Sequence, residues 1–122
     1  MADVDMSLKE AMTIEGAIGA ALVDYTSGMM LGMAGGSEID LAVASAGNTD
    51  VVRAKLRTVE MLRLPDQIED ILITLDTQYH LIRPLNSRGG RGLFLYLALR
   101  RERANLALAR HQLKTIEANL QF

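Results

Sequence analysis

The sequence lacks several features that define common protein classes. It has no cysteine, which excludes disulfides, thiolate nucleophiles and cysteine-zinc sites. Its longest apolar runs, residues 17–23 and 93–99, fall far short of the ~20 residues that span a bilayer. It has no basic excess, since the formal net charge is −2, and this argues against a nucleic-acid partner. We therefore expect a cytoplasmic protein that does not insert into a membrane.

The length of 122 residues predicts a single domain, residues 1–122, because a second domain would be too small to bury its own core. Apolar residues make up 49% and charged residues 23%, a balance typical of a globular fold. The start, MADVDMSLKEAM, is acidic where a secretory signal needs positive charge. Charge is unevenly spread, because residues 1–50 carry eight acids and one base, whereas residues 51–122 carry twelve bases and seven acids.

Hydrophobic periodicity predicts the order helix, two strands, helix, three strands, helix, which is an α+β arrangement. The first strand is apolar on both faces, so it is expected to lie centrally with cover on both sides. The expected elements are a helix at 4–12, strands at 15–25 and 29–33, a helix at 37–62, strands at 68–75, 79–85 and 93–99, and a closing helix with the apolar stripe Leu106, Ala109, Leu113, Ile116 and Leu120.

The long central helix has a defined start and stop. Ser37 followed by Asp40 is a capping-box-like start, and acids there suit the positive end of the helix dipole. Pro65 prevents the helix from extending much beyond Leu62. Gly47 weakens the middle of the helix by ~1 kcal/mol relative to alanine, so this glycine is expected to have a packing reason.

His80 is the residue that a search for an enzyme would single out, with Asp76, Tyr79 and Arg83 close by. On a strand, Tyr79 and Arg83 point to the face opposite His80, so Arg83 is not its natural partner. Asp76 lies in the preceding turn, where spacing does not define the direction of its side chain. The nucleophile turn G-x-S-x-G is absent as well. We interpret His80 as structural and predict a protein that is not an enzyme and has no catalytic residue. A small enzyme or ligand sensor that uses His80, Tyr79 and Arg83 is the weaker alternative.

No metal or cofactor is predicted. The two histidines, His80 and His111, lie on separate elements, which makes a poor metal site. The glycine-rich run before the long helix lacks the lysine of a phosphate-binding loop, and Glu38 and Asp40 would repel a phosphate there. The methionines within 29–33 are interpreted as core filler on an edge strand, although methionines also suit adaptable contact surfaces.

The long helix carries small side chains in a row. Val43, Gly47, Asp50 and Ala54 lie on one side at helical spacing, and small residues let another backbone come close. Close packing on the protein's own sheet is the alternative, since either partner would bury this face. The predicted interface with a second copy consists of Val43, Gly47, Asp50, Val51, Ala54, Ile71 and Ile73.

Charge along the same helix favours a twofold arrangement. Acids occupy its first half and bases its second, so two antiparallel copies would set opposite charges against each other, although this asymmetry also suits the helix dipole. Arg53 and Arg57, one turn apart, are predicted to contact a partner protein or to bridge the two subunits. The strand at 71–75 has no lysine or proline, so at a sheet edge it would be open to pairing with a neighbour.

The order of elements and several stretches resemble the Roadblock (dynein light-chain) family, most closely its small stand-alone bacterial members, particularly those of actinobacteria. The resemblance extends from about Met6 to Leu120. Its most specific part is the pattern G-x-x-G-x-x-L-V-D-x-x-S-G, from Gly16 to Gly28. The matching stretches are IEGAIGAALVDYTSGMML, LAVASAGNTDVVRAKL, EDILITLDTQYHLIRPL, LFLYLAL and ANLALARHQL.

The resemblance implies a Roadblock/profilin-like sandwich: a five-stranded antiparallel sheet of order 2-1-5-4-3, with the long helix on one face and the terminal helices on the other. It also implies homodimers or heterodimers in which the central helices lie antiparallel and the sheets join.

The resemblance further implies a role. Family members regulate or scaffold small Ras-like GTPases, and some bacterial members stimulate hydrolysis without inserting an arginine finger. We therefore expect a homodimer that binds a small Ras-like GTPase and stimulates hydrolysis by ordering its switch regions, with another Roadblock protein as the other candidate subunit. A pure signalling adaptor without effect on nucleotide turnover is the alternative.

Overall fold

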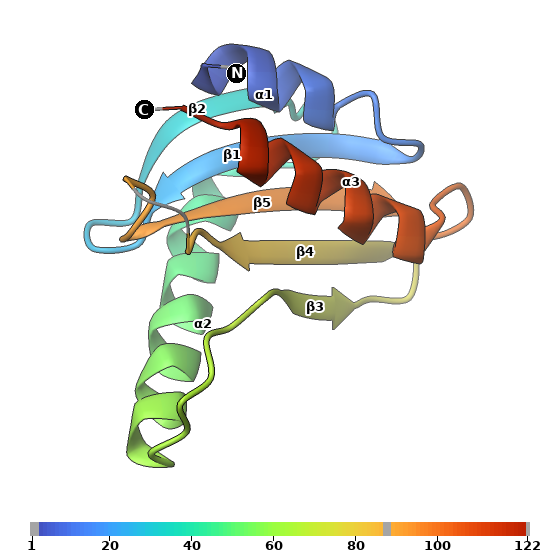
Figure 1. Ribbon diagram of the computed structural model, residues 1–122. Coiled ribbons are helices and arrows are strands. Elements are labelled where there is room, and N and C mark those ends of the chain that lie inside the picture. The colour runs from blue at the N-terminus through green and yellow to red at the C-terminus, as the bar shows by residue number, and fades with distance from the viewer. Residues whose placement is uncertain (1–2, 87–88, 122) are drawn as a thin grey trace.

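A computed structural model describes residues 3–86 and 89–121, and within them three helices and five strands follow the predicted order (Figure 1). The elements are α1 (Val4–Ala11), β1 (Ala17–Asp24), β2 (Met29–Gly35), α2 (Leu41–Met61), β3 (Ile71–Thr74), β4 (Gln78–Pro84), β5 (Leu93–Arg100) and α3 (Leu106–Asn119). The strands form one sheet of order β2-β1-β5-β4-β3 in which all neighbours are antiparallel, and this confirms the implied order.

Two separate cores cover the two faces of the sheet. Helices α1 and α3 lie on one face and α2 lies on the other (Figure 1). The central strands β1 and β5 are buried on both faces, as the apolar pattern of β1 predicts. The α1/α3 core includes Leu8, Leu22, Leu97, Ala109, Leu113 and Ile116, and the α2 core includes Ile18, Val23, Val52, Phe94 and Tyr96.

The start of α2 differs from the prediction of a Ser37 cap. Asp40 is the N-cap, with extended backbone angles, and its carboxylate accepts a hydrogen bond of 3.0 Å from the Val43 N–H. The carboxylate at Asp40 therefore satisfies one of the free N–H groups of the first turn and moves the start of the helix to Leu41.

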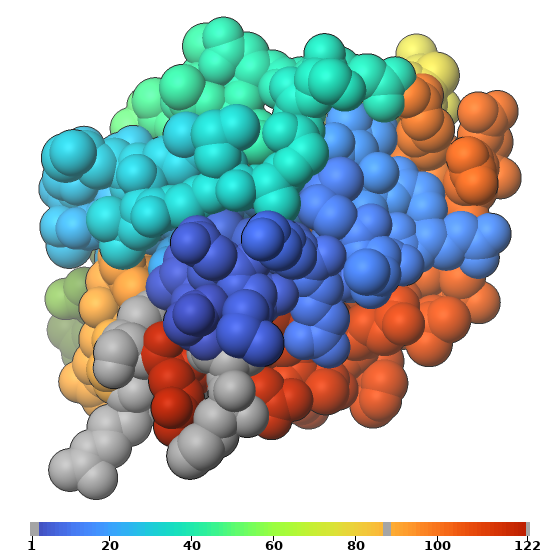
Figure 2. All heavy atoms as spheres, turned by 90° about the horizontal axis from the view of Figure 1, so that it is seen from above, coloured from blue at the N-terminus to red at the C-terminus, as the bar shows by residue number. Residues whose placement is uncertain are grey.

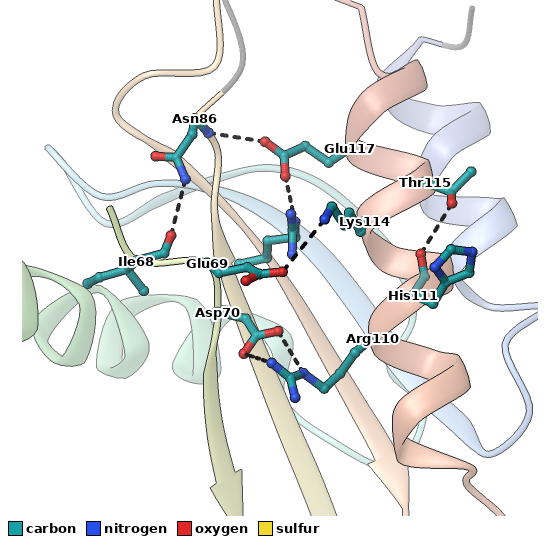
Figure 3. A network of polar contacts seen from close by, with 10 residues as sticks. Ile68, Glu69, Asp70, Asn86, Arg110, His111, Lys114, Thr115 and Glu117 are labelled. Carbon is teal, nitrogen blue, oxygen red and sulfur yellow. Dashed lines mark hydrogen bonds and ion pairs between the residues drawn. The ribbon is translucent and has the colours of Figure 1, made fainter. Parts of the chain in front are cut away.

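The strand predicted at 68–75 is also shorter, because side chains hold the residues before Ile71 away from the ladder. Asp70 accepts two hydrogen bonds, of 2.8 and 3.0 Å, from the guanidinium of Arg110 on α3 (Figure 3). The Ile68 carbonyl accepts a hydrogen bond of 3.1 Å from the Asn86 side chain. The segment between α2 and β3 is thus tied to α3 before it joins the sheet.

Arg83 and Glu117 form a buried ion pair beside this tie. The Arg83 Nε lies 2.5 Å from Glu117 Oε1, and the side chains of both residues are less than a tenth exposed. The second carboxylate oxygen accepts a hydrogen bond of 3.1 Å from the Asn86 N–H (Figure 3). The pair fixes the last turns of α3 on β4, since neither charge has water as an alternative partner.

We predict that Glu117→Ala lowers the free energy of unfolding by about 3–5 kcal/mol, because it leaves the Arg83 guanidinium buried and unpaired. Urea unfolding followed by circular dichroism measures the loss. The double variant Arg83→Met with Glu117→Leu should recover most of it. Glu69→Ala, whose carboxylate is exposed and 3.8 Å from Lys114 Nζ, should change stability by less than about 0.5 kcal/mol. A loss below about 1 kcal/mol for Glu117→Ala would contradict the buried pairing.

Candidate functional site: the outward face of the central helix

The central helix α2 buries only a narrow stripe against its own sheet. Leu41, Ser45, Thr49 and Val52 are its buried residues. The two hydroxyls in this stripe donate to helix carbonyls one turn earlier, Ser45 Oγ to Leu41 O at 2.6 Å and Thr49 Oγ1 to Ser45 O at 2.8 Å. The helix therefore buries polar groups without cost in unmade hydrogen bonds, and its opposite side takes no part in the core.

The five helix residues predicted to contact a second copy all lie exposed on that opposite side. Val43 is 67% exposed and Val51 36% exposed. Gly47, Asp50 and Ala54 are exposed as well. A Cβ added at Gly47 would meet no atom within 4 Å outside its own helix and neighbours, so packing on the protein's own sheet does not explain this glycine.

The far end of α2 projects beyond the sheet. The helix runs across the strands from the β2 side (Figure 1). Its 21 residues span about 31 Å, whereas four strand spacings span only about 19 Å. The projecting end exposes Met61 by 75%, Leu62 by 60% and Leu64 by 46%. Sequence analysis missed these three residues, although the three apolar residues within Met61-Leu62-Arg63-Leu64, directly before Pro65, were the available signal.

Strand β3 lies at the sheet edge that the projecting helix crosses. Among the described residues it pairs only with β4, so its other backbone edge is open. Ile71 and Ile73, which were predicted interface residues, are partly buried and pack against the α2 core. Leu72 faces the other way and is 38% exposed. The open feature of β3 is therefore its backbone and Leu72 more than the two isoleucines.

Arg53 and Arg57, the predicted partner contacts, are exposed on the flank of the outward stripe. Neither arginine forms an ion pair with another described residue. The structure thus leaves both guanidinium groups available for an acidic group on another chain.

Both ring nitrogens of His80 are engaged by neighbouring side chains. Its Nε2 lies 2.8 Å from Gln78 Oε1, and its Nδ1 lies 3.2 Å from the Tyr96 hydroxyl, with the two rings edge to face. A neutral imidazole satisfies both contacts if Nε2 donates and Nδ1 accepts. Burial lowers the pKa of His80 and raises the pKa of Tyr96 to about 12, which favours the neutral form of each ring.

The residues of the alternative enzyme hypothesis lie apart. Tyr79 packs against the α1/α3 core, and Arg83 is bound to Glu117 on that same face. His80 lies on the α2 face, where it pairs across the strands with Ile73 and Ala98. The sheet separates His80 from both proposed partners, so these three side chains do not form one site.

A hollow of about 680 Å³ lies at the turn between β3 and β4. Its cations are already engaged. Arg101 donates to the Leu75 carbonyl at 2.9 Å and stacks on the Tyr79 ring, while Arg100 pairs with Glu38. No group of three or more metal-binding side chains occurs among the described residues. None of the described helices combines the length and the apolar character that crossing a bilayer requires.

Comparisons with known proteins identify the fold. No family model and no curated protein matches the sequence. A Roadblock/LC7 domain from Streptomyces avermitilis superposes with a TM-score of 0.80 at 13% identity, over 96% of this chain and 93% of that chain. MglB from Myxococcus xanthus superposes with a TM-score of 0.73 at 18% identity, over 93% and 85%. Another MglB structure has a tetrameric arrangement, with a TM-score of 0.75 at 15% identity, over 92% and 80%.

These similarities define the class of fold. The chain has the Roadblock/LC7 fold, as the resemblance in the sequence implied. The solved structures that share this fold include proteins of bacteria, namely Streptomyces avermitilis and Myxococcus xanthus.

The burial of His80 predicts a pH dependence of stability. Above its ordinary pKa of 6.5, His80 is neutral in both the folded and the unfolded chain. As the pH falls below that value, the unfolded chain binds the proton more readily, so the free energy of unfolding falls until the lower folded-state pKa is passed. Urea titrations between about pH 7 and pH 5 measure this slope. His80→Gln should flatten it, whereas His111→Gln, on the exposed side of α3, should keep it; equal slopes in wild type and His80→Gln would refute the assignment.

Proposed function

We propose that the protein is a non-enzymatic regulator of a small Ras-like GTPase and acts as a homodimer through its paired α2 helices. The observation that carries the proposal is the outward stripe of α2. Apart from Asp50 its side chains are apolar or small, it lies opposite the buried stripe, and a Cβ added at Gly47 would meet nothing within 4 Å outside the helix. An exposed face of this kind on a long helix is typical of a docking surface.

An antiparallel twofold pairing would use three features together. The projecting ends of the two helices would each reach across β3 to the other subunit, which would cover Met61 and Leu62. The open edges of the two β3 strands would face each other. Asp50 in the first half of one helix would approach the basic second half of the other, where Arg53 and Arg57 are exposed. Geometry, apolar cover and charge thus favour the same arrangement.

Arg53 and Arg57 have two candidate roles in such a dimer. They would either contact acidic groups of the GTPase beside the helix pair or bridge to Asp50 of the second subunit. If the dimer accelerates hydrolysis, we propose that it does so by ordering the switch segments of the GTPase, because ordered switch loops hold the attacking water and the charge in place.

The Roadblock/LC7 fold supports this proposal, since the family that the sequence resembles regulates or scaffolds small GTPases. A pure adaptor that recruits signalling proteins without changing nucleotide turnover is the second candidate. Another Roadblock protein in place of one subunit would use the same α2 surface.

We predict that Gly47→Leu converts the dimer to a monomer while each subunit remains folded. The leucine has open space within the subunit, and replacing a mid-helix glycine should raise subunit stability by about 0.5–1 kcal/mol. Light scattering coupled to gel filtration reports the mass. Lys55→Leu, exposed on another side of the same helix, is the matched control and should remain dimeric. A dimeric Gly47→Leu protein would remove the α2 stripe from the interface.

We predict that the dimer binds a small Ras-like GTPase of the same genome and that Arg53→Glu with Arg57→Glu weakens binding at least about tenfold, because two favourable charges become repulsive. Surface plasmon resonance measures affinity. Lys55→Glu is the control for an added acid on α2. A double variant that binds normally but becomes monomeric would assign both arginines to the subunit contact instead.

Phosphate release from that GTPase loaded with GTP separates the two candidate functions. Acceleration by the wild-type dimer supports a regulator, and an unchanged rate with retained binding supports an adaptor. The protein alone is expected to release no phosphate.

A further inference from the structure

The second edge of the sheet, β2, is open along its outer side. Among the described residues β2 pairs only with β1. Residues 29–36, MMLGMAGG, contain no charged residue and no proline, which are the usual guards of an exposed edge. Backbone donors and acceptors of this edge are therefore free to pair with another extended chain.

Exposed apolar side chains form a row along the same edge, with Met33 on the α2 face of the sheet and Met29 on the α1 face. Met29 is 66% exposed, Leu31 52% and Met33 51%. The α1 face of the strand is closely covered at Gly32, where an added Cβ would lie 2.9 Å from the side chains of both Leu8 and Val4. Figure 2 looks onto this end of the molecule, where α1 in dark blue lies beside β2 in cyan. Unbranched methionine side chains adapt to varied apolar partners, which suits a docking row.

A bulge bends β2, so its edge fits a rigid strand of another folded copy less well than a flexible peptide. Leu22 of β1 pairs with Gly32, whereas Val23 pairs with Met30, so Leu31 is an extra residue without a partner in β1. Bulges bend a strand and discourage pairing between rigid edges. A flexible extended segment can follow the bend, and a second copy of β2, with its own bulge, fits it less well.

A shallow hollow of about 520 Å³ lies next to the row, on the α2 side of the sheet. Met30, Met33, Ile39 and Leu41 supply apolar lining. Asp40 also lines it, and its charge outweighs the partial positive charge of the helix start that it caps. The hollow would accept a side chain with an apolar stem and a positively charged head.

Charge around this edge is acidic. Residues 1–50 carry eight acids and one base, Lys9. Asp3 and Asp5 lie at the start of α1, Asp24 lies opposite Met29 in the ladder, and Asp40 lies at the hollow. Two copies of this edge would bring these carboxylates together and repel each other, whereas a basic partner would be attracted.

We infer that the outer edge of β2 binds an extended segment of a partner protein in which apolar residues alternate with lysine or arginine. The segment adds a strand to the sheet by backbone hydrogen bonds. On the α2 face its lysine or arginine stems cover Met33 and place their charged heads at Asp40, and its apolar side chains lie on the α1 face beside Met29. The inference is independent of the α2 interface, because β2 and β3 lie at opposite edges of the sheet.

A pair of fluorescein-labelled peptides tests the inference with the full chain. The first has eight residues of alternating valine and lysine, and the second replaces each lysine by glutamate. Fluorescence anisotropy should show saturable binding of the basic peptide, weakened by added salt, and at least about tenfold weaker binding of the acidic peptide. Absence of binding by the basic peptide, or equal binding of both, overturns the inference.

Three variants locate the binding. Leu31→Lys should weaken binding of the basic peptide at least about tenfold, because it adds a repelling charge to the apolar row. Asp40→Asn should weaken it several-fold while the helix remains capped, since asparagine caps as well as aspartate. Leu108→Lys places the same substitution at an exposed leucine of α3, outside both proposed interfaces, and should leave binding unchanged.

The native mass of Leu31→Lys decides between a peptide and a second copy. If Leu31→Lys has the same native mass as the wild-type protein, the β2 edge is not a contact between copies, which agrees with a segment of another protein as the occupant. A lower mass would show that β2 edges pair with each other and would overturn the inference. Leu31→Lys binding as tightly as wild type would overturn it as well. Gly47→Leu does not alter β2. The native mass of Gly47→Leu therefore tests the α2 dimer, and peptide binding tests the β2 edge, so the two proposals can fail separately.

Discussion

Cover for both apolar faces of β1 and β5 is the constraint on which the rest of the structure depends. These two strands are buried along nearly their whole length, so each face of the sheet needs a layer of helix. On one face α1 and α3 together cover the sheet, and the ion pair of Arg83 with Glu117 fixes α3 in place. On the other face a single helix, α2, supplies the cover with a narrow stripe. Because α2 covers its face of the sheet alone and with a narrow stripe, most of its surface is left for contacts outside the subunit.

The length of α2 links this packing to function. A helix that runs across the strands needs only about four turns to cover the sheet, and α2 has 21 residues, close to six turns. The surplus exposes Met61 and Leu62, whose burial would be favourable by about 1.5–3 kcal/mol each. The outward stripe around Gly47 and the projecting end are thus parts of one continuous surface, which explains why the proposed dimer uses the helix along its length.

Sequence patterns predicted the fold well because most elements have a clear period. The run of apolar residues in β1 and the 3-4 stripe of α3 both indicate their structure and their buried faces. Errors occurred where side chains override local patterns. Asp40, and not Ser37, is the N-cap of α2. The hydrogen bonds of Asp70 with Arg110, forty positions later in the chain, shorten β3. Contacts between residues so far apart in the chain leave no local signal.

The candidate sites were predictable in part. Spacing alone placed Val43, Gly47 and Ala54 on one side of a helix, but burial was needed to show that this side faces away from the sheet. The methionines of β2 had two interpretations in the sequence, and only the strand order shows them at an open edge.

The position of β2 at the edge opposite β3 has a consequence for valency. Any twofold assembly joined at β3 carries its two β2 strands at its outer ends, facing away from each other. Such an assembly would present two widely separated binding edges. A partner with two matching segments on a linker long enough to reach both ends would gain avidity of about 10²–10⁴ over a single segment, and a shorter linker would gain none.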